Sequence, residues 1–363
     1  MNPKLDVVIV GPIAPPRGGV SAHVERLARL LAHHDLLVGI LDHFSSRHHP
    51  LVIGTLGRNP FRYWQKMRKL DAPVVHYHHA NWFTLIAAAV ARPDHGTWLA
   101  TFHGERIIWS LNSRVPGIAA LTRWAVRRFD HILGVNDALA KTIYQQTGSR
   151  VSVIPAYLPR EEAQRDHADG SEGLTAVVAA YRVAARSSDD LYGLDIAIAI
   201  FVAASERLPN LRLKLFLAQE PESTRARRYL EGILRPLEEA QLRDRFTLHT
   251  DVDLTSAFRP GAVYLRTTRT DGDSVSVREA LDAGVPVLAS DVVQRPVGVV
   301  TLALHDISAW VNAIQAVVGE SPQRAGPRES FQHADALIHL YTNIVKRPSL
   351  TPTLEVRGHD SMD

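Results

Sequence analysis

The sequence predicts an α/β protein of two Rossmann-like domains that face each other across a cleft. Two observations lead to this prediction. Apolar β-like runs alternate with amphipathic helical stretches, a pattern typical of βαβ units and a parallel sheet. The alternation stops at a polar segment and then restarts, and a chain of 363 residues is long enough for two cores of about 100–200 residues each.

Residues 1–160 contain the first series of elements. Its expected strands are Leu5–Val10, Leu36–Leu41, Val74–Tyr77, Thr97–Phe102, His131–Val135 and Val151–Ile154. Its expected helices include Val20–Ala32, Pro116–Arg128 and Asp137–Gln146. In open sheets of this kind ligands bind at the carboxyl ends of the strands, so the residues that follow these strands are the first candidates for a site.

A second series follows a predicted linker at residues 161–173, which is polar and nearly free of large apolar groups. The expected strands are Leu174–Ala180, Arg212–Leu217, Arg245–His249, Ala262–Leu265 and Val285–Ala289. The expected helices are Leu194–Glu206, Ser223–Ala240, Ser276–Ala283, Ile307–Val318 and Phe331–Val345. They define a second domain over residues 174–345, and residues 346–363 are predicted to be a disordered tail.

Composition excludes several classes of function. The chain has no cysteine, which rules out disulfides, thiolate metal sites and cysteine nucleophiles. No stretch approaches the roughly 18 apolar residues that span a bilayer. The first eleven residues lack the pattern of a signal peptide. We therefore expect a cytoplasmic protein whose membrane contact is at most peripheral, on the inner face of the membrane.

Charge is distributed unevenly along the chain. Residues 1–170 carry a formal net charge of +7 and the remainder carries −4. A basic first half attracts anionic partners such as phosphates, acidic lipids or nucleic acid, and charge alone does not choose among them. No nucleic-acid-binding module accompanies the charge, so we do not expect a nucleic-acid partner.

The first candidate site is the loop after the first expected strand, which ends in Gly18 and Gly19 and leads into a helix. Glycines let backbone N–H groups approach a ligand closely, and a helix N-terminus suits phosphate. A simple turn rich in proline and glycine explains the same residues, and the loop does not match the GxGxxG fingerprint.

Histidines provide the second candidate. His103 follows an expected strand, where its side chain can hydrogen-bond a sugar hydroxyl, meet developing charge or transfer a proton. The run that contains His76, His78 and His79 suggests a metal site. Strand alternation, however, places His76 and His78 on one face and His79 on the other, and no helical Glu/His partner is evident. We therefore expect no metal ligands there, although His78 or His79 at a strand end can line the cleft.

The third candidate follows the expected strand Ala262–Leu265. Asp271 lies in a loop and Glu279 lies eight positions later, in the expected first turn of a helix. Both carboxylates can accept hydrogen bonds from sugar hydroxyls. A capping box formed by Ser276 and Glu279 explains the glutamate equally well without a ligand.

The stretch from Asp271 to Val287 resembles glycosyltransferase family 4, the large retaining family of the GT-B fold. These enzymes carry an acid, seven residues, a glutamate, and then a Gly-x-Pro-Val turn before a strand. The resemblance extends over nearly the whole chain, to about residue 345. Its residues here are Gly18, Gly19, Thr101–Gly104, Ile154–Pro155, Asp271, Glu279, Ala280, Gly284, Pro286 and Val287.

The resemblance implies a sugar-nucleotide-binding second domain and an acceptor-side first domain. Gly18 and Gly19 would lie against the donor diphosphate, and His103 would lie near the transferred sugar. Glu279 would hold the ribose hydroxyls. Asp271, where the family more often has glutamate, would contact the donor sugar with a side chain one methylene shorter.

The resemblance also concerns the groups that bind the donor diphosphate, and here the sequence departs from the family at one position. The resemblance implies that Ser274, Val275 and Ser276 lend backbone N–H groups to the donor, and that Arg182 neutralises the leaving group. The family's lysine is replaced by Tyr192, and Arg186 is a nearby substitute. Loss of a cation at a diphosphate costs leaving-group stabilisation of about a few kcal/mol.

The implied reaction transfers a sugar from a nucleoside diphosphate sugar to an acceptor hydroxyl with retention, in cell-surface polysaccharide or glycolipid synthesis. The transition state is oxocarbenium-like, and arginine and backbone N–H groups can stabilise the departing β-phosphate without a metal. Asp271-Gly-Asp273 superficially matches a metal-binding Asp-x-Asp string, but its place in the longer motif argues otherwise. The alternatives are a non-catalytic sugar-nucleotide-binding protein on the same fold and a sugar-nucleotide epimerase.

We expect the acceptor to be a glycan or a lipid-linked molecule, and few residues of the sequence bear on which. The segment 58–69 is basic and aromatic, and residues 123–128 are similar. Either surface can dock on acidic lipid, through Arg62, Lys66 and Lys69 in the first of them. A solvated helix face with buried aromatic rings explains the same pattern.

Overall fold

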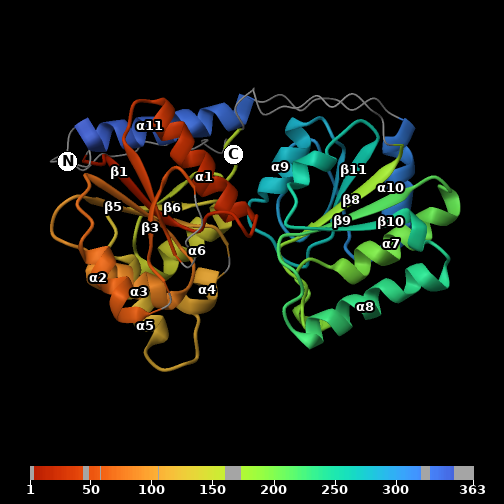
Figure 1. Ribbon diagram of the computed structural model, residues 1–363, viewed down its shortest axis with the longest axis horizontal. Helices are drawn as coiled ribbons and strands as arrows, with labels where there is room; N and C mark the ends of the chain where they lie inside the picture. Colours follow the sequence, from red (N-terminus) through yellow and green to blue (C-terminus); the bar gives the residue numbers. More distant parts are fainter. Residues whose placement is uncertain are drawn as a thin grey trace, which may run out of the picture. The chain divides into compact units, whose positions relative to one another are not determined.

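The computed structural model forms two compact units. It describes residues 4–43, 49–57, 59–104, 106–159, 173–319 and 328–346, so the predicted linker and tail lie almost entirely outside the described residues. The first unit comprises Met1–Ile13, Val20–Leu158 and Glu329–Asp363, and the second comprises Ala14–Gly19 and Pro159–Arg328. Figure 1 shows that each unit is a parallel sheet covered by helices.

The first unit contains a seven-stranded parallel sheet in the order β3-β2-β1-β4-β5-β6-β7. Its strands are β1 (Val7–Gly11), β2 (Val38–Asp42), β3 (Val52–Thr55), β4 (Val74–His78), β5 (Thr97–Phe102), β6 (His131–Gly134) and β7 (Val151–Val153). Every residue of β1, β2 and β4 is buried. Parallel strands that are covered on both faces are mostly apolar, which explains why the sequence revealed them. The polar exceptions in these three strands are Asp42, His76 and His78.

The helices of the first unit include one from the far end of the chain. They are α1 (Gly19–His33), α2 (Pro60–Arg68), α3 (Trp82–Ala91), α4 (Arg106–Leu111), α5 (Ile118–Val126), α6 (Asp137–Thr147) and α11 (Arg328–Lys346). The helix α11, which the sequence placed in the second domain, is part of this unit and lies beside α1 in Figure 1. Its apolar side chains, Leu337 and Tyr341 among them, share one core with Val24 and Leu27 of α1.

The second unit contains a six-stranded parallel sheet in the order β10-β9-β8-β11-β12-β13. Its strands are β8 (Thr175–Ala180), β9 (Arg212–Leu217), β10 (Phe246–Thr250), β11 (Ala262–Arg266), β12 (Val287–Ser290) and β13 (Val299–Leu302). Alternate residues face opposite sides of the sheet. Val178 and Leu265 accordingly belong to one core cluster, whereas Val177 and Tyr264 belong to another.

The helices of the second unit cover both faces of this sheet. They are α7 (Leu194–Arg207), α8 (Thr224–Glu239), α9 (Val275–Asp282) and α10 (Ile307–Gly319), with single 3₁₀ turns at Ser187–Asp189, Arg243–Arg245 and Leu254–Ala257. Side chains of α7 and α10, with Trp310 at their centre, pack on one face. Side chains of α9 pack on the other face. Among the described helices of both units, none has the length and apolar content required to cross a bilayer.

Strand order determines where a ligand site can form. In each sheet the chain adds strands on one side of the first strand and then on the other, so the order reverses beside β1 in the first unit and beside β8 in the second. At such a point the loops after the two central strands diverge and leave a crevice outside their carboxyl ends. The neighbours at the two reversals are β4 and β11.

Gly193 gives the fold of the second unit a position that no other residue can fill without strain. It precedes α7 with φ of 60°, and an added β-carbon would lie 2.0 Å from the backbone oxygen of Thr267. The Gly193→Ala variant should therefore lose at least about 2 kcal/mol of unfolding free energy, from the left-handed backbone and from the clash. Differential scanning calorimetry measures the loss.

Gly232 provides the matched control for that substitution. It lies exposed within α8, and nothing would lie within 4 Å of an added β-carbon. The Gly232→Ala variant should be more stable by about 0.5–1 kcal/mol, because alanine favours helix. Equal effects of the two substitutions would contradict the close approach at Gly193.

Candidate active site

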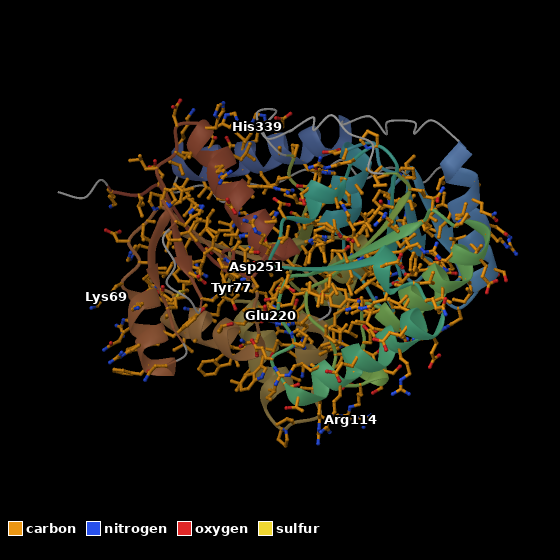
Figure 2. All side chains as sticks on the ribbon, turned by 45° about the vertical axis from the view of Figure 1, so that its right-hand side comes forward. Lys69, Tyr77, Arg114, Glu220, Asp251 and His339 are labelled. Atoms are coloured by element: carbon orange, nitrogen blue, oxygen red, sulfur yellow. The ribbon has the colours of Figure 1, made fainter. Side chains whose placement is uncertain are left out.

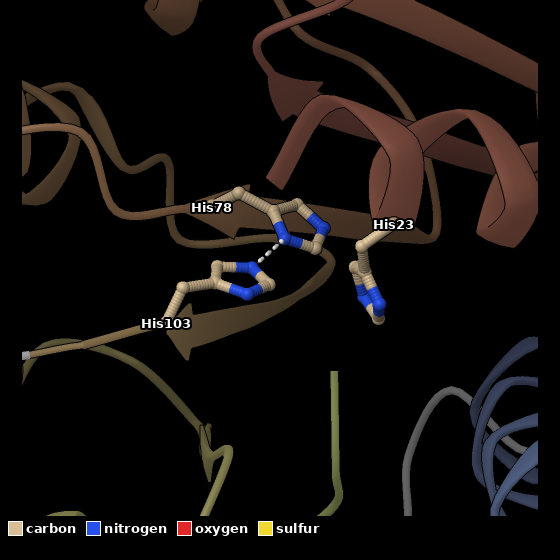
Figure 3. Close-up of side chains that lie close together, drawn as sticks. All are labelled: His23, His78 and His103. Carbon is tan, nitrogen blue, oxygen red and sulfur yellow. Dashed lines mark hydrogen bonds between the residues drawn. The ribbon is translucent and has the colours of Figure 1, made fainter. Parts of the chain in front are cut away.

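Three histidines meet at the strand-order reversal of the first unit. His78 is the last residue of β4, His103 follows β5, and His23 lies in α1. We call these three residues the imidazole triad. Figure 3 shows that their side chains come together from the three elements. Gly11 permits this approach, because a β-carbon there would lie 2.7 Å from Val24 and 3.3 Å from the β-carbon of His78.

The triad is compact. The ring centroid of His23 lies 5.2 Å from that of His78 and 5.0 Å from that of His103. The Nδ1 atom of His78 and the Nε2 atom of His103 are hydrogen-bonded at 2.9 Å. One nitrogen from each ring can be chosen so that all three lie within 4.8 Å of one another.

The hydrogen bonds of the triad leave one buried nitrogen unpaired. The Nδ1–H group of His23 donates to the carbonyl oxygen of Ala156 at 2.6 Å, because a carbonyl can only accept. The Nε2 atom of His78 is buried and has no hydrogen-bond partner among the described residues. A buried polar atom without a partner costs about 1–3 kcal/mol.

His76, in contrast, is bonded at both ring nitrogens, whereas His79 has a buried Nε2 without a partner among the described residues. His76 contacts the hydroxyl of Tyr341 through Nδ1 and that of Thr101 through Nε2, the latter at 2.7 Å. Its ring lies 4.2 Å from that of His78, whereas His79 packs on Phe102. The predicted alternation along β4 is therefore correct. The partners of His78 come from α1 and from beyond β5, and sequence spacing did not reveal them.

Burial lowers the pKa values of the triad. The pKa of His23 falls to about 4, because desolvation outweighs the hydrogen bond to Ala156. Burial, followed by the neighbouring imidazoles, holds the pKa values of His78 and His103 well below the ordinary value. All three rings are therefore neutral at pH 7, and each has one N–H donor and one unprotonated nitrogen.

Several arginines lie at the carboxyl ends of the strands of the second sheet, near the point where its strand order reverses between β8 and β11. Arg182 is exposed two residues after β8. Arg266 ends β11, and its guanidinium lies over the ring of Tyr192, 5.6 Å from the centroid. Tyr192 occupies the place where the resemblance implies a lysine, so Arg266 supplies a buried cation beside that position. Arg186, the substitute considered from the sequence, is exposed and pairs locally with Asp189 at 2.9 Å.

Asp271 is buried between two guanidinium groups. Arg266 donates to both of its oxygens at 2.8 and 2.9 Å, and Arg295 donates to Oδ2 at 2.7 Å. We call Arg266, Asp271 and Arg295 the arginine–aspartate cluster. Arg295 is fixed further by a bond to the backbone oxygen of Ser290 at 3.1 Å. A sugar hydroxyl at Asp271 would therefore share an oxygen that already accepts from an arginine.

Mutual stabilisation sets the charges in this cluster. Burial alone would raise the pKa of Asp271, but the Arg266 and Arg295 guanidiniums hold it below its ordinary value. Burial alone would lower the pKa of Arg266, but the Asp271 carboxylate raises it. Two guanidiniums and one carboxylate leave one excess positive charge at the edge of the sheet, which attracts an anion.

Glu279 and the serines before it lie on α9. The helix begins at Val275 with Ser274 as its N-cap residue, so Glu279 is in the second turn and the expected capping box with Ser276 is absent. The Ser276 hydroxyl contacts that of Tyr264 at 2.7 Å and that of Ser274 at 3.1 Å. Glu279 is half-buried. A role as a helix cap therefore does not account for this glutamate.

Gly18 and Gly19 belong to the second unit, although they follow β1 in the chain. A β-carbon at Gly18 would lie 2.9 Å from the ring of Tyr181, and one at Gly19 would lie 3.6 Å from Val275. Any side chain at Gly18 would therefore displace the ring next to Arg182. Of these two neighbours, Val275 is a residue that the sequence assigned to the same site, and Tyr181 is one that it did not.

The basic segment of the first unit is an exposed face of α2. Arg62, Gln65, Lys66 and Lys69 line a shallow groove of about 350 Å³, and Figure 2 shows Lys69 at the outer edge of the unit. Phe61 beside them is 62% exposed. Lys66 also donates to the backbone oxygen of Thr55. In the second basic segment, Arg123 and Arg127 donate to backbone oxygens and support the fold.

Comparison with known proteins identifies the fold. The chain matches no family model and no curated protein. It is similar to sucrose-phosphate synthase from Thermosynechococcus elongatus, with a TM-score of 0.65 and 16% identity over 94% of this chain and 97% of that one. It is similar to HepE from Anabaena in complex with UDP and glucose, with a TM-score of 0.63 and 13% identity over 94% and 98%.

A third similar structure is WaaG, a glycosyltransferase involved in lipopolysaccharide biosynthesis, with a TM-score of 0.61 and 13% identity over 94% and 98%. At these identities the likeness establishes architecture. The predicted fold class of two Rossmann-like domains is confirmed, and it is the GT-B fold of these glycosyltransferases.

The arginine–aspartate cluster makes a stability prediction. Replacing Asp271 by Asn should lower the unfolding free energy of the second unit by about 3–5 kcal/mol, because two buried guanidiniums lose their countercharge. Calorimetry of the full chain measures the change. The control is Asp189→Asn, which breaks the exposed pair with Arg186 and should cost less than about 0.5 kcal/mol. Similar costs for both variants would show that Asp271 does not hold the arginines.

Proposed function

We propose that the protein transfers a sugar from a nucleoside diphosphate sugar to an acceptor hydroxyl, with retention of the anomeric configuration. The observation that carries the proposal is the position of the acid-x7-Glu motif. Asp271 and Glu279 follow β11, at the strand-order reversal of the second sheet, where a parallel sheet binds ligands. The likeness to HepE, which was solved with UDP and glucose, and to WaaG, a glycosyltransferase, supports the same reaction.

The cations would stabilise the leaving nucleoside diphosphate. As the glycosidic bond breaks, negative charge develops on the β-phosphate, and fixed positive groups lower the energy of that transition state. Arg182 is exposed at the carboxyl end of the second sheet. Arg266, beside Tyr192, would contribute the positive charge that a lysine supplies in the family. Asp271 would act by holding Arg266 and Arg295 in place. Under this proposal no metal ion is required for transfer.

The remaining polar groups would orient the donor. Glu279 would accept hydrogen bonds from the ribose hydroxyls, and the first N–H groups of α9, at Val275 and Ser276, would donate to a phosphate or to the sugar. His103 would bind the transferred sugar through a neutral imidazole. These assignments follow from the resemblance. His103 follows β5 in the first unit, and the residues of α9 follow β11 in the second.

A binding screen with two variants tests the proposal. Saturation at about 100 times Kd stabilises a protein by about 2.7 kcal/mol, so one of the UDP-, GDP- or ADP-sugars should raise the melting temperature of the wild-type chain. The Glu279→Ala variant should lose that shift, because two charge-assisted hydrogen bonds disappear. The His103→Ala variant should keep much of the shift and lose turnover by at least about 100-fold.

The control for the charge change is Glu239→Ala, at the exposed end of α8. It should leave both the thermal shift and turnover unchanged. No shift with any nucleotide sugar would contradict the proposed function. A shift without transfer or hydrolysis would identify a non-catalytic binder, and conversion of the donor without an acceptor would identify an epimerase.

We also propose that the acceptor is lipid-linked and that the α2 face docks on acidic lipid, at the inner face of a membrane. The groove lined by Arg62, Lys66 and Lys69 supports this, since exposed Phe61 lies beside it. Arg68 lies over the ring of Trp64 at 5.4 Å and adds a further cation to this face. An amphipathic basic and aromatic surface is typical of proteins that bind anionic membranes.

Liposome flotation tests the membrane proposal. Each basic residue near an anionic surface contributes about 1 kcal/mol, so replacing Arg62, Lys66 and Lys69 by alanine should weaken binding to acidic vesicles by roughly 100-fold. Neutral vesicles should bind neither protein.

The matched control removes the same number of cations, Arg225, Arg228 and Arg235, from exposed positions of α8 in the second unit. This variant should float with acidic vesicles like the wild type. Equal binding by the α2 variant and the wild type would exclude the α2 face as the docking surface.

A further inference from the structure

We propose that the imidazole triad of His23, His78 and His103 is a binding site for a divalent transition-metal ion, with Zn²⁺ as the best match. The site lies wholly within the first unit, at the carboxyl ends of β4 and β5. The inference does not rest on the proposed glycosyl transfer.

The number and chemistry of the ligands support this ion. Three neutral imidazoles with no carboxylate form a donor set that suits Zn²⁺, Cu²⁺ and Ni²⁺, whereas Mg²⁺ and Ca²⁺ require oxygen ligands. Three histidines leave the fourth position of a tetrahedral Zn²⁺ open to water or a ligand. His103 is the one member of the triad that retains appreciable exposed surface, which gives an ion a route to the site.

The distances are compatible with coordination. Zn–N bonds of about 2.0–2.1 Å in a tetrahedral site put two nitrogens about 3.4 Å apart. Since one nitrogen from each ring can be chosen so that the three lie within 4.8 Å of one another, no pair of these three atoms has to close by more than about 1.4 Å. Small side-chain rotations are sufficient for such a change.

The surrounding hydrogen bonds prepare two of the rings for an ion. The bond from His23 Nδ1–H to the Ala156 oxygen fixes the tautomer that leaves Nε2 unprotonated, which is the usual outer-shell arrangement of a metal-binding histidine. His78 has a buried Nε2 with no partner among the described residues. With the proton on Nδ1, donated to Nε2 of His103, that atom carries a lone pair to which the structure gives no other role. Nε2 of His103 accepts this hydrogen bond and would release it on binding the ion.

Two other buried histidines nearby are bonded at both nitrogens, whereas His79 also has a buried Nε2 without a partner among the described residues, although it packs on Phe102. Both nitrogens of His76 are hydrogen-bonded to hydroxyls. His43 is also bonded at both nitrogens, to the His78 carbonyl oxygen at 2.9 Å and to the Tyr63 hydroxyl at 3.1 Å. The triad differs from His76 and His43 because its rings face one another and leave the Nε2 atom of His78 unused.

Metal titration of the full chain tests the proposal. Untagged protein is freed of metal with EDTA, dialysed, and titrated with Zn²⁺ by calorimetry and with Co²⁺ by visible absorption, without nucleotide. We expect one Zn²⁺ per chain, a tetrahedral Co²⁺ spectrum that Zn²⁺ abolishes, and no heat with Mg²⁺. His78→Ala and His103→Asn should each weaken Zn²⁺ binding by at least about 100-fold.

Controls separate the triad from surface imidazoles and from misfolding. His95→Ala removes an exposed histidine and should bind Zn²⁺ like the wild type. Circular dichroism and thermal unfolding verify each variant, and if His78→Ala does not fold, the partly exposed His103→Asn decides. The proposal is overturned if the wild type binds no stoichiometric Zn²⁺, or if folded triad variants bind it as tightly as the wild type. Because no nucleotide is present, failure here leaves the donor-binding experiment unaffected.

Discussion

The reversal of strand order in each sheet is the constraint on which the rest of the structure depends. Because the chain leaves β1 for β2 and later returns to place β4 on the other side, the loops after β1 and β4 diverge. The same order recurs in the second unit with β8 and β11. Each divergence frees the end of a buried sheet for polar side chains that a packed interior would exclude. The imidazole triad occupies one such end, and the arginine–aspartate cluster occupies the other.

The fold could be predicted from the sequence wherever burial dictates composition. The central strand β1 is apolar throughout because helices cover both faces of the sheet. The strands β3 and β13 were not predicted. Both are four-residue edge strands with exposed positions, Ile53 and Val300 among them, so their sequences lack a continuous apolar run. The helix α11 was predicted as an element but placed in the wrong unit, because amphipathic periodicity shows that a face is buried and not which core buries it.

The sequence predicted where the candidate site lies in the fold, but it did not predict which side chains contact one another there. The spacing of Asp271 and Glu279 identified the loop and helix after β11, because motif residues there are local in sequence. It did not reveal that Asp271 binds two arginines, since Arg295 lies 24 residues further along the chain and arginines are common on surfaces. Arg266 had one usable signal, its place at the end of a buried strand. His23 reaches His78 and His103 because α1 packs closely on the chain at Gly11. That contact joins residues distant in sequence and cannot be predicted from a single sequence.

The return of α11 to the first unit has a consequence for biosynthesis. Tyr341, Leu337 and Leu340 fill a core whose other walls, including Ile9 and Leu27, are translated first. Domains usually fold in order as they leave the ribosome, but here the leading half is missing an interior wall until the trailing half has emerged. Apolar surface next to β1 stays open to water or to chaperones for most of synthesis. The two halves are therefore not interchangeable modules, and a chain cut after the second sheet would leave the first with an unfilled interior.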